Sequence, residues 1–313
     1  MQTPKLDTVT GLPPIPAMTT QAERECYYRL AAEAAGNGAV IEFGAWLGAS
    51  TAYIAAAMRD TGNGQKAHVY DKFQSKKGHI AKVRKFYAAN GINEADMPIG
   101  DAFDRFKQNM GDLFQHITPH QGEIAHVKWG KEPIALIVND APKRVDAISA
   151  VLTNFREGIR EGTMMAWQDF CHFPSYEIPA SLYRLRDNFE FTESVVPGTT
   201  LVFRVKKVWK PQDVSRLALA LNSWSVAEIA AAWAYWADYV PEEKQALFRC
   251  GQAMFLSDIG QSAEAVKVLD AVLAEGHKDC MVKWDYLRTS RPDFFIRYRP
   301  LFDCFARHEK LAA

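Results

Sequence analysis

Short apolar runs recur through the first two thirds of the chain, and segments with helical periodicity separate them. The clearest runs cover residues 40–43, 67–71, 133–140, 163–167 and 199–205. Runs that stay apolar without alternation are typical of strands buried on both faces of a parallel sheet. Helical patterns lie between them, at residues 21–35, 145–160 and 183–189. This order of elements predicts an α/β fold with a doubly wound, Rossmann-like and mostly parallel sheet.

Four of the expected strands end in an acidic residue. These residues are Glu42, Asp71, Asp140 and Asp169. Ligands of parallel sheets bind beyond the carboxyl ends of the strands, so we expect the four carboxylates to converge in one crevice. Such a convergence favours an enzyme.

The segment between the second and third of these strands, residues 72–115, is longer and more polar than a simple crossover. It contains a basic helical stretch at residues 79–90 and a second helical stretch at residues 103–114. The basic stretch is either a solvated helix face or a lid that recognises the substrate.

From residue 210 onwards the pattern is helical throughout. Residues 246–258 and 262–275 form a helical hairpin, with Ala253 and Ala265 about where a tetratricopeptide unit packs its two helices. We therefore predict an N-terminal arm (1–24), an α/β domain (25–207) and an all-α C-terminal domain (208–313). The aromatic residues just before the hairpin should mostly be core, although an exposed subset could stack on a sugar ring. They are Trp224, Trp233, Tyr235, Trp236 and Tyr239.

The first strand runs into a glycine turn and an alanine-rich helix, where bare backbone amides can meet a ligand. A phosphate-binding P-loop needs Lys before its Ser or Thr, and here Ala49 precedes Ser50. A dinucleotide-binding turn needs G-x-G-x-x-G, whereas three residues separate Gly44 from Gly48. The turn therefore belongs to neither of these two classes.

The composition of the chain limits which partners and which cellular compartment we expect. Lys and Arg together number 37, as do Asp and Glu, so charge offers no argument for a nucleic acid or an anionic membrane as partner. No apolar run approaches the roughly 20 residues that span a bilayer, and the N-terminus lacks an apolar signal-peptide core. The five scattered cysteines form no CxxC pair. We expect reduced thiols in a cytoplasmic protein, with neither a disulfide framework nor a zinc site.

Five segments carry a family resemblance: VIEFGAWLGAST, VYDKF, GEIAHVKWGKEPIALIVNDAPK, WQDFCHF and GTTLVFRV. Over residues 25–207 the chain resembles the class I S-adenosylmethionine-dependent methyltransferases. More narrowly, it resembles bacterial sugar O-methyltransferases of the macrocin type. The resemblance implies methyl transfer from S-adenosylmethionine to a hydroxyl group.

The resemblance also implies which residues hold the cofactor. Glu42, Gly44 and Gly48 would line its methionine end, together with Ser50 and Thr51 from the same turn. Glu42 would face the cationic amino group, and the glycines would let the backbone approach the ligand.

At the other end of the cofactor, Asp71 would hold the ribose hydroxyls. The acid on the adenine side is either Asp101 or Glu123, and Glu123 fits the spacing to the next strand better. Asp140 would border the transferring methyl group.

The sequence departs from the macrocin-type pattern at two places. Pro142 stands where a second acid follows the position of Asp140, and Gln168-Asp169 replaces a paired Asp-Asp. A site for a divalent cation is therefore damaged. Asp140 and Asp169, with the carbonyl of Gln168, could hold Mg²⁺ or Ca²⁺ only weakly.

Transfer to a hydroxyl needs a base for the proton. His172 follows the strand that ends at Asp169, and a neutral imidazole suits this task. Asp169 would orient His172 or bind metal, and Asp140 is the competing base. The alternative for His172 is an ordinary histidine in a surface loop.

The resulting hypothesis is an O-methyltransferase that acts on a sugar or glycoconjugate, with a His/Asp general base. A second hypothesis, which the losses at Pro142 and Gln168 keep open, is a degenerate methyltransferase-like module that binds cofactor and partners without catalysis. A nicotinamide-dependent oxidoreductase fits the glycine spacing poorly. The expected partner is a small-molecule or saccharide acceptor. The sequence leaves three points open: the methylated position, the role of the helical region and the oligomeric state, for which a homo-oligomer is one option.

Overall fold

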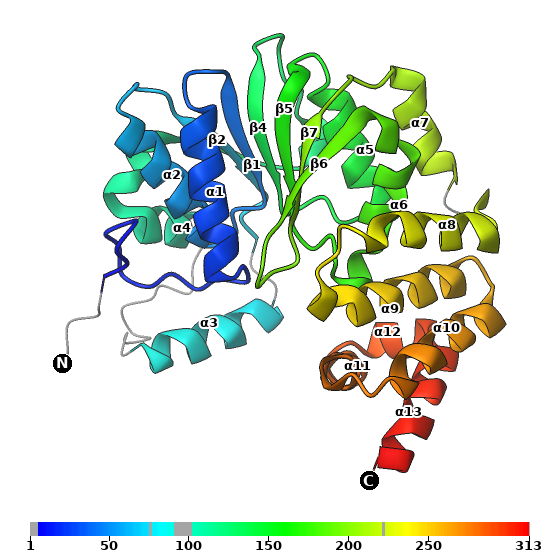
Figure 1. The fold of residues 1–313 in the computed structure, drawn as a ribbon. Coiled ribbons are helices and arrows are strands. Elements are labelled where there is room, and N and C mark those ends of the chain that lie inside the picture. Colours follow the sequence, from blue (N-terminus) through cyan, green and yellow to red (C-terminus); the bar gives the residue numbers. More distant parts are fainter. Residues whose placement is uncertain (1–5, 75–76, 91–101, 221–222, 313) are drawn as a thin grey trace.

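A seven-stranded sheet with the order β3-β2-β1-β4-β5-β7-β6 runs through the computed structural model (Figure 1). The structure describes residues 6–74, 77–90, 102–220 and 223–312. The parallel strands are β1 (Ala39–Phe43), β2 (Ala67–Asp71), β3 (Ile117–Gln121), β4 (Ile134–Asn139) and β5 (Ile159–Trp167). Strand β7 (Leu201–Val205) pairs antiparallel with β5 and with β6 (Phe189–Ser194). The doubly wound, mostly parallel sheet is thus confirmed.

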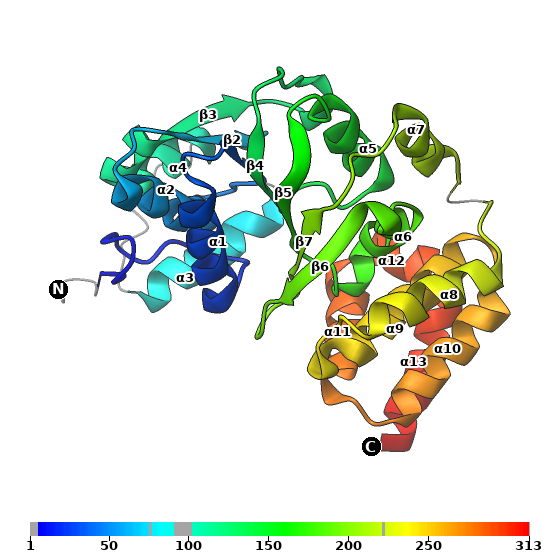
Figure 2. The ribbon, with the colours of Figure 1, turned by 45° about the horizontal axis from the view of Figure 1, so that its top comes forward.

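Helices cover both faces of this sheet, as Figure 2 shows from a second side. Side chains alternate along β1, so Val40 packs into one hydrophobic core while Ile41 and Phe43 pack into the other. One face carries α1 (Gln21–Ala34), α2 (Ala49–Thr61) and α4 (Ala102–Met110). The other carries α5 (Val145–Asn154), α6 (Glu177–Arg184) and α7 (Pro211–Ala220). The remaining elements of this part are α3 (Lys77–Ala89) and the short 3₁₀ helices η2 (Gly111–His116), η3 (Ile124–His126), η4 (Phe173–Ser175) and η5 (Arg186–Asn188).

The sequence patterns missed two strands at the edges of the sheet. Strand β3 contains Pro119, which an edge strand tolerates because one side of it has no ladder to complete. Strand β6 starts at Phe189, so the helix expected over residues 183–189 was wrong beyond Arg184. The helix expected over residues 145–160 was also too long, because α5 ends at Asn154 and β5 begins at Ile159.

The C-terminal third is helical, as expected. It consists of α8 (Val226–Ala237), α9 (Glu242–Asp258), α10 (Ser262–Ala274), α11 (Lys278–Ser290), α12 (Pro292–Arg297) and α13 (Arg299–Ala312). Helices α9 and α10 form the expected hairpin, and Ala253 and Ala265 are both fully buried. Small side chains at these positions let two helices approach closely.

These helices share one hydrophobic core with the sheet. The ring of Trp236 on α8 meets Phe170 edge-on, with 5.2 Å between centroids, and its Nε1 donates to the carbonyl of Pro179 at 2.9 Å. Trp224, Trp233 and Trp236 are at most 4% exposed, which confirms them as core, whereas Tyr235 is 37% exposed. The helical region is therefore joined to the α/β part by buried aromatic packing.

The N-terminal arm is tied to the sheet by a buried carboxylate. Thr20 caps α1 in a capping box with Glu23, which is only 1% exposed. Glu23 Oε1 accepts hydrogen bonds from Thr199 N at 2.9 Å and Thr200 Oγ1 at 2.8 Å. The arm thus reaches the start of β7, at the carboxyl edge of the parallel strands.

Two further expectations concern membranes and cysteines. None of the helices in the described ranges combines the length and apolar character needed to cross a membrane. All five cysteines are buried free thiols.

Candidate active site

The turn after β1 depends on two glycines with positive φ. Gly44 has φ +97°, and a Cβ there would lie 2.7 Å from the backbone nitrogen of Ala141. Gly48 has φ +98°, and a Cβ there would lie 3.0 Å from Met110 Sδ. Helix α2 begins after Gly48 without a side-chain cap, so its first N–H groups are left for a ligand. Glycine is therefore required at both positions by contacts with other residues of the protein.

Glu42 supports this turn from below. Ser50 Oγ donates to Glu42 Oε1 at 2.5 Å, and Thr51 Oγ1 donates to Glu42 Oε2 at 2.6 Å. Burial raises the pKa of Glu42 to about 8, although the two hydroxyl hydrogen bonds favour the carboxylate. Glu42 and Thr51 have no exposed surface and Ser50 has little. The structure brings the three together beneath the turn, so direct contact of Glu42 with a cofactor stays a prediction.

Asp71 is held rigidly at the end of β2. Its carboxylate accepts hydrogen bonds from the backbone nitrogens of Trp46, at 2.8 Å, and Phe73, at 2.6 Å. Trp46 and Phe73 both adopt left-handed backbone conformations, with φ of 46° and 50°. Residues in such conformations cluster at ligand sites. The partly exposed Asp71 carboxylate keeps the capacity to accept further hydrogen bonds, as ribose hydroxyls would require.

Glu123 follows β3, on the same edge of the sheet. It is half exposed, and its Oε1 lies 2.5 Å from Nζ of Lys72, the residue that directly follows Asp71. The alternative adenine-side acid, Asp101, lies outside the described residues.

A lysine sits between the two acids that end β4 and β5. Lys143 Nζ lies 2.9 Å from Asp140 Oδ1 and 3.0 Å from Asp169 Oδ2. It also donates to the side-chain oxygen of Gln168 and lies 3.5 Å from the carbonyl oxygen of Gln168. Sequence reasoning missed Lys143, although its place three residues after Asp140, in the turn that follows the strand, was a readable signal.

The charges of this cluster support one another. Burial acts to lower the pKa of Lys143, but the Asp140 and Asp169 carboxylates outweigh it and the net shift is upward. Burial acts to raise the pKa of Asp169, but Lys143 and His172 outweigh it and the net shift is downward. Burial raises the pKa of Asp140 against the pull of Lys143. Lys143 is therefore a fixed ammonium at neutral pH and cannot serve as the base.

The same cluster does not fit a divalent cation. The oxygens expected to coordinate one are those of Asp140, Asp169 and the Gln168 carbonyl, and all of them surround the Lys143 ammonium. A metal ion there would meet a positive charge in the centre of its ligand set. The structure therefore gives no support to the Mg²⁺ or Ca²⁺ site that the sequence left open.

His172 lies beside this cluster. Its Nδ1 is buried without a hydrogen-bond partner and lies 3.8 Å from Asp169 Oδ2. Burial lowers the pKa of His172, and Lys283 and Lys143 add to the shift while Asp169 opposes it. Asp169 itself has φ 62°, a conformation that a non-glycine residue rarely adopts. Because Nδ1 is buried, Nε2 is the ring nitrogen available to a ligand.

These residues line a cavity of about 710 Å³ at the carboxyl edge of the sheet. Its floor includes Asp140, Lys143, Asp169 and His172, so the structure brings these together, as expected for the three of them that the sequence indicated. The walls come from the N-terminal arm, from α3 through Phe86, and from helices α9 and α11. Figure 1 shows α3 and α9 on opposite sides below this edge. Cavities of this size hold small organic ligands.

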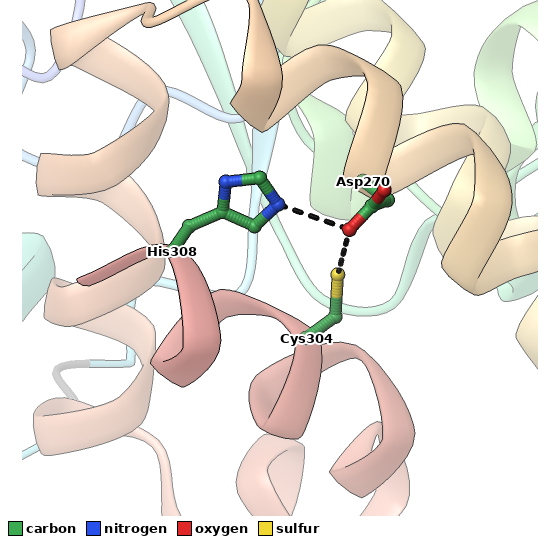
Figure 3. A group of neighbouring side chains, drawn as sticks. All are labelled: Asp270, Cys304 and His308. Carbon is green, nitrogen blue, oxygen red and sulfur yellow. Dashed lines mark hydrogen bonds and ion pairs between the residues drawn. The ribbon is translucent and has the colours of Figure 1, made fainter. Parts of the chain in front are cut away.

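A second group of polar side chains joins α10 to α13, away from this cavity (Figure 3). His308 Nε2 lies 3.0 Å from Asp270 Oδ1, and Cys304 Sγ lies 3.7 Å from the same oxygen. Burial raises the pKa of Cys304 to about 11, so the thiol stays protonated. The three satisfy one another across the helix interface, which explains their proximity without a metal ion.

Comparison with known proteins gives one family match. The sequence pattern of a methyltransferase domain matches residues 41–170, which contain the turn after β1 and the acids ending β1, β2, β4 and β5. A comparison with curated proteins gives no match.

Solved structures offer weaker likenesses. The O-methyltransferase NovP is 15% identical, with 59% of this chain and 80% of that chain covered and a TM-score of 0.43. CalS11, a TDP-rhamnose 3'-O-methyltransferase of calicheamicin biosynthesis, is 17% identical, with 58% and 76% covered and a TM-score of 0.39. PaMTH1 of Podospora anserina, solved with SAH bound, is 13% identical, with 61% and 80% covered and a TM-score of 0.38. These likenesses are too distant to carry an argument about the acceptor.

The residues present fit the cofactor of such a domain: the start of α2 has no side-chain cap, and Asp71 and Asp140 lie at the carboxyl ends of β2 and β4, the two strands that flank β1. Residues 41–170 thus carry the sequence pattern of a methyltransferase domain, on a doubly wound, mostly parallel sheet.

Proposed function

We propose that the protein transfers the methyl group of S-adenosylmethionine to a hydroxyl group of a sugar or glycoconjugate bound in the cavity at the carboxyl edge. One observation carries the proposal: His172, whose pKa is lowered, lines one cavity together with the Lys143 ammonium and the carboxylates of Asp140 and Asp169, beside the turn after β1. The sugar as acceptor rests on the sequence resemblance to macrocin-type enzymes.

The bound cofactor supplies an electrophilic methyl group on a positively charged sulfur. Asp71 accepts hydrogen bonds from the ribose hydroxyls, and Glu123 lies on the adenine side. Asp140 borders the methyl group, while Glu42, Gly44, Gly48, Ser50 and Thr51 shape the turn that holds the methionine end. Positioning of this kind can supply much of the rate of a bimolecular transfer.

His172 takes the proton of the acceptor hydroxyl through Nε2. The imidazole is neutral near pH 7 because burial lowers the pKa of His172, so it can accept a proton. The Asp169 carboxylate, 3.8 Å from Nδ1, stabilises the imidazolium that forms. This distance is longer than a hydrogen bond, and we expect it to shorten when an acceptor is bound.

Lys143 supplies the positive charge that a divalent cation would otherwise bring. Its ammonium keeps Asp140 and Asp169 close together in the cavity floor. The reaction we propose therefore needs no metal ion.

The proposal is tested by incubating the purified protein with methyl-labelled S-adenosylmethionine and a panel of free sugars, sugar phosphates and glycosides. Label recovered in a methyl ether, with S-adenosylhomocysteine formed in equal amount, supports it. Cofactor binding without transfer to any hydroxyl would favour the non-catalytic module that binds partners through its helical region.

A further inference from the structure

The cavity has one wall that the methyl-transfer chemistry does not use. Lys244 and Leu247 on α9, and Lys283 and Tyr286 on α11, line the side opposite the sheet. Both helices lie in the C-terminal region, below the carboxyl edge of the strands (Figure 1). This wall is therefore contributed by a part of the chain outside the matched methyltransferase domain.

The two lysines of this wall form no ion pair with any side chain that the structure describes. Across the described part of the chain, neither ammonium group has a hydrogen-bond partner. The other cations of the cavity are paired: Lys143 with Asp140 and Asp169, and Arg291 with Asp293 at 2.9 Å.

Glu23, the other acidic residue that lines the cavity, does not neutralise Lys244 or Lys283. Glu23 is buried, and Thr199 and Thr200 already donate to its carboxylate. The lysine wall thus keeps a net positive charge that faces a cavity of about 710 Å³.

The lysines also lie close to the reacting end of the cavity. The charge of Lys283 acts on the imidazole of His172, and the charge of Lys244 acts on the neighbouring Cys171. A ligand that contacts both lysines must therefore lie next to the loop that carries His172.

We propose that the acceptor bears an anionic group, a phosphate or a carboxylate, that Lys244 and Lys283 bind together. The assignment rests on the proposed function, because it places the acceptor in this cavity. Binding of the anion on α9 and α11 directs the rest of the acceptor towards His172 and the methyl group. The helical region is thereby the part of the chain that selects the acceptor.

The test measures acceptor affinity by calorimetry on full-length protein saturated with S-adenosylhomocysteine. The probes are glucose, glucose 6-phosphate and glucuronate, which share a ring and differ in charge. The variant K244M/K283M removes both charges and keeps side-chain length. The matched control K206M/K207M removes two exposed lysines at the end of β7, on the opposite edge of the sheet.

Wild-type protein and the control should bind at least one charged probe about tenfold or more tightly than glucose, and added salt should weaken that preference. K244M/K283M should lose the preference and keep its weak affinity for glucose. Either order of the two charged probes supports the proposal and identifies the anion as phosphate or carboxylate. A wild-type protein that binds neither charged probe better than glucose overturns it, as does a double variant that keeps the preference.

The same titrations separate this inference from the proposed function. Failure of wild-type protein to bind S-adenosylhomocysteine would contradict the methyltransferase reaction itself. Normal binding of S-adenosylhomocysteine to wild type and both variants, without any charge preference among the probes, contradicts only the anionic acceptor.

Discussion

Lys143 Nζ lies 3.0 Å from Asp169 Oδ2, and the two residues come from turns after different strands, β4 and β5. Lys143 also contacts Asp140, so a side-chain ammonium holds the two carboxylates of the cavity together in place of a metal ion. A positively charged side chain that is part of the polypeptide is always present, whereas a divalent cation must be captured from solution.

The first prediction concerns metal dependence. We expect a chelator and added Mg²⁺ to leave both turnover and melting temperature of the wild-type protein unchanged, because the ammonium already fills the position. Lys143→Ala should destabilise the fold by about 1–3 kcal/mol, since two neighbouring carboxylates lose their counterion. Mg²⁺ should then raise the melting temperature of Lys143→Ala but not of the control Lys207→Ala. Wild-type activity that is abolished by chelator and restored by Mg²⁺ would show that the ammonium leaves the site during turnover.

The second prediction concerns the base. His172→Ala should lower turnover by about 10²–10⁴-fold while cofactor affinity hardly changes. The imidazole is active when neutral, so wild-type turnover should rise with pH through a pKa below the ordinary value of 6.5, because burial lowers the pKa of His172. The variant should lose this rising limb, and the surface control His277→Ala should keep it. Near-normal turnover of His172→Ala would assign the role to Asp140 or Asp169.

The third prediction concerns the ribose site. Asp71→Ala should weaken S-adenosylmethionine binding by about 1.5–3 kcal/mol, because a charged hydrogen-bond acceptor is lost. Asp71→Asn should lose less, since its amide oxygen can still accept a hydrogen bond from Trp46 N, which now bonds to the carboxylate at 2.8 Å. Calorimetry on wild type and both variants measures the order. Equal affinity in all three proteins would remove Asp71 from the cofactor site.

The fourth prediction concerns pH and stability. The pKa of Glu42 is raised from 4.5 to about 8, so the folded protein holds this proton more tightly than the unfolded chain. The contribution of Glu42 to stability is therefore complete below pH 4.5 and is lost as the pH rises towards 8. Each tenfold difference in proton affinity between the folded and unfolded chain corresponds to about 1.4 kcal/mol. Urea unfolding at several pH values should show that Glu42→Gln removes this part of the slope; an unchanged slope would contradict the assignment.

The fifth prediction concerns the joint between the sheet and the helices. Trp236 is 1% exposed and packs on Phe170 and Phe203, so Trp236→Ala should cost about 3–5 kcal/mol. The neighbouring Tyr235→Ala, at a position 37% exposed, should cost clearly less. Calorimetry should show one unfolding transition for the whole wild-type chain. Two separate transitions would instead support independent domains divided near residue 208.

Sequence reasoning located the parts of the site that follow buried strands. The acids at the carboxyl ends of β1, β2, β4 and β5 could be read because a parallel strand is apolar and ends abruptly. The edge strands β3 and β6 were missed, because a strand covered on one side needs no continuous apolar run. The alternation of Phe189 and Phe191 with polar residues was the available signal for β6.

Contacts between distant segments could not be read in this way. Lys143 was visible in the turn after Asp140, but its contact with Asp169 depends on how two turns meet across the sheet edge. Lys244 and Lys283 lie on helices that pack on the loop after β5 through aromatic contacts between residues far apart in the sequence, Phe248 with Phe170 and Trp284 with Phe173. Periodicity identifies a helix and its buried face, but it does not say which part of the molecule that face covers.

Two parts of the chain line the cavity: the α/β part and the C-terminal helices. Asp140 and Asp169 follow strands of the sheet, whereas Lys244 and Lys283 lie on helices that come after the last strand. Substitutions on the exposed sides of α9 and α11 therefore leave the residues that are predicted to hold the cofactor unchanged. Under the proposed function, gene duplicates of such a protein could diverge in what they methylate while inheriting the methyl donor unchanged, and laboratory selection for a new acceptor can begin on those two helices.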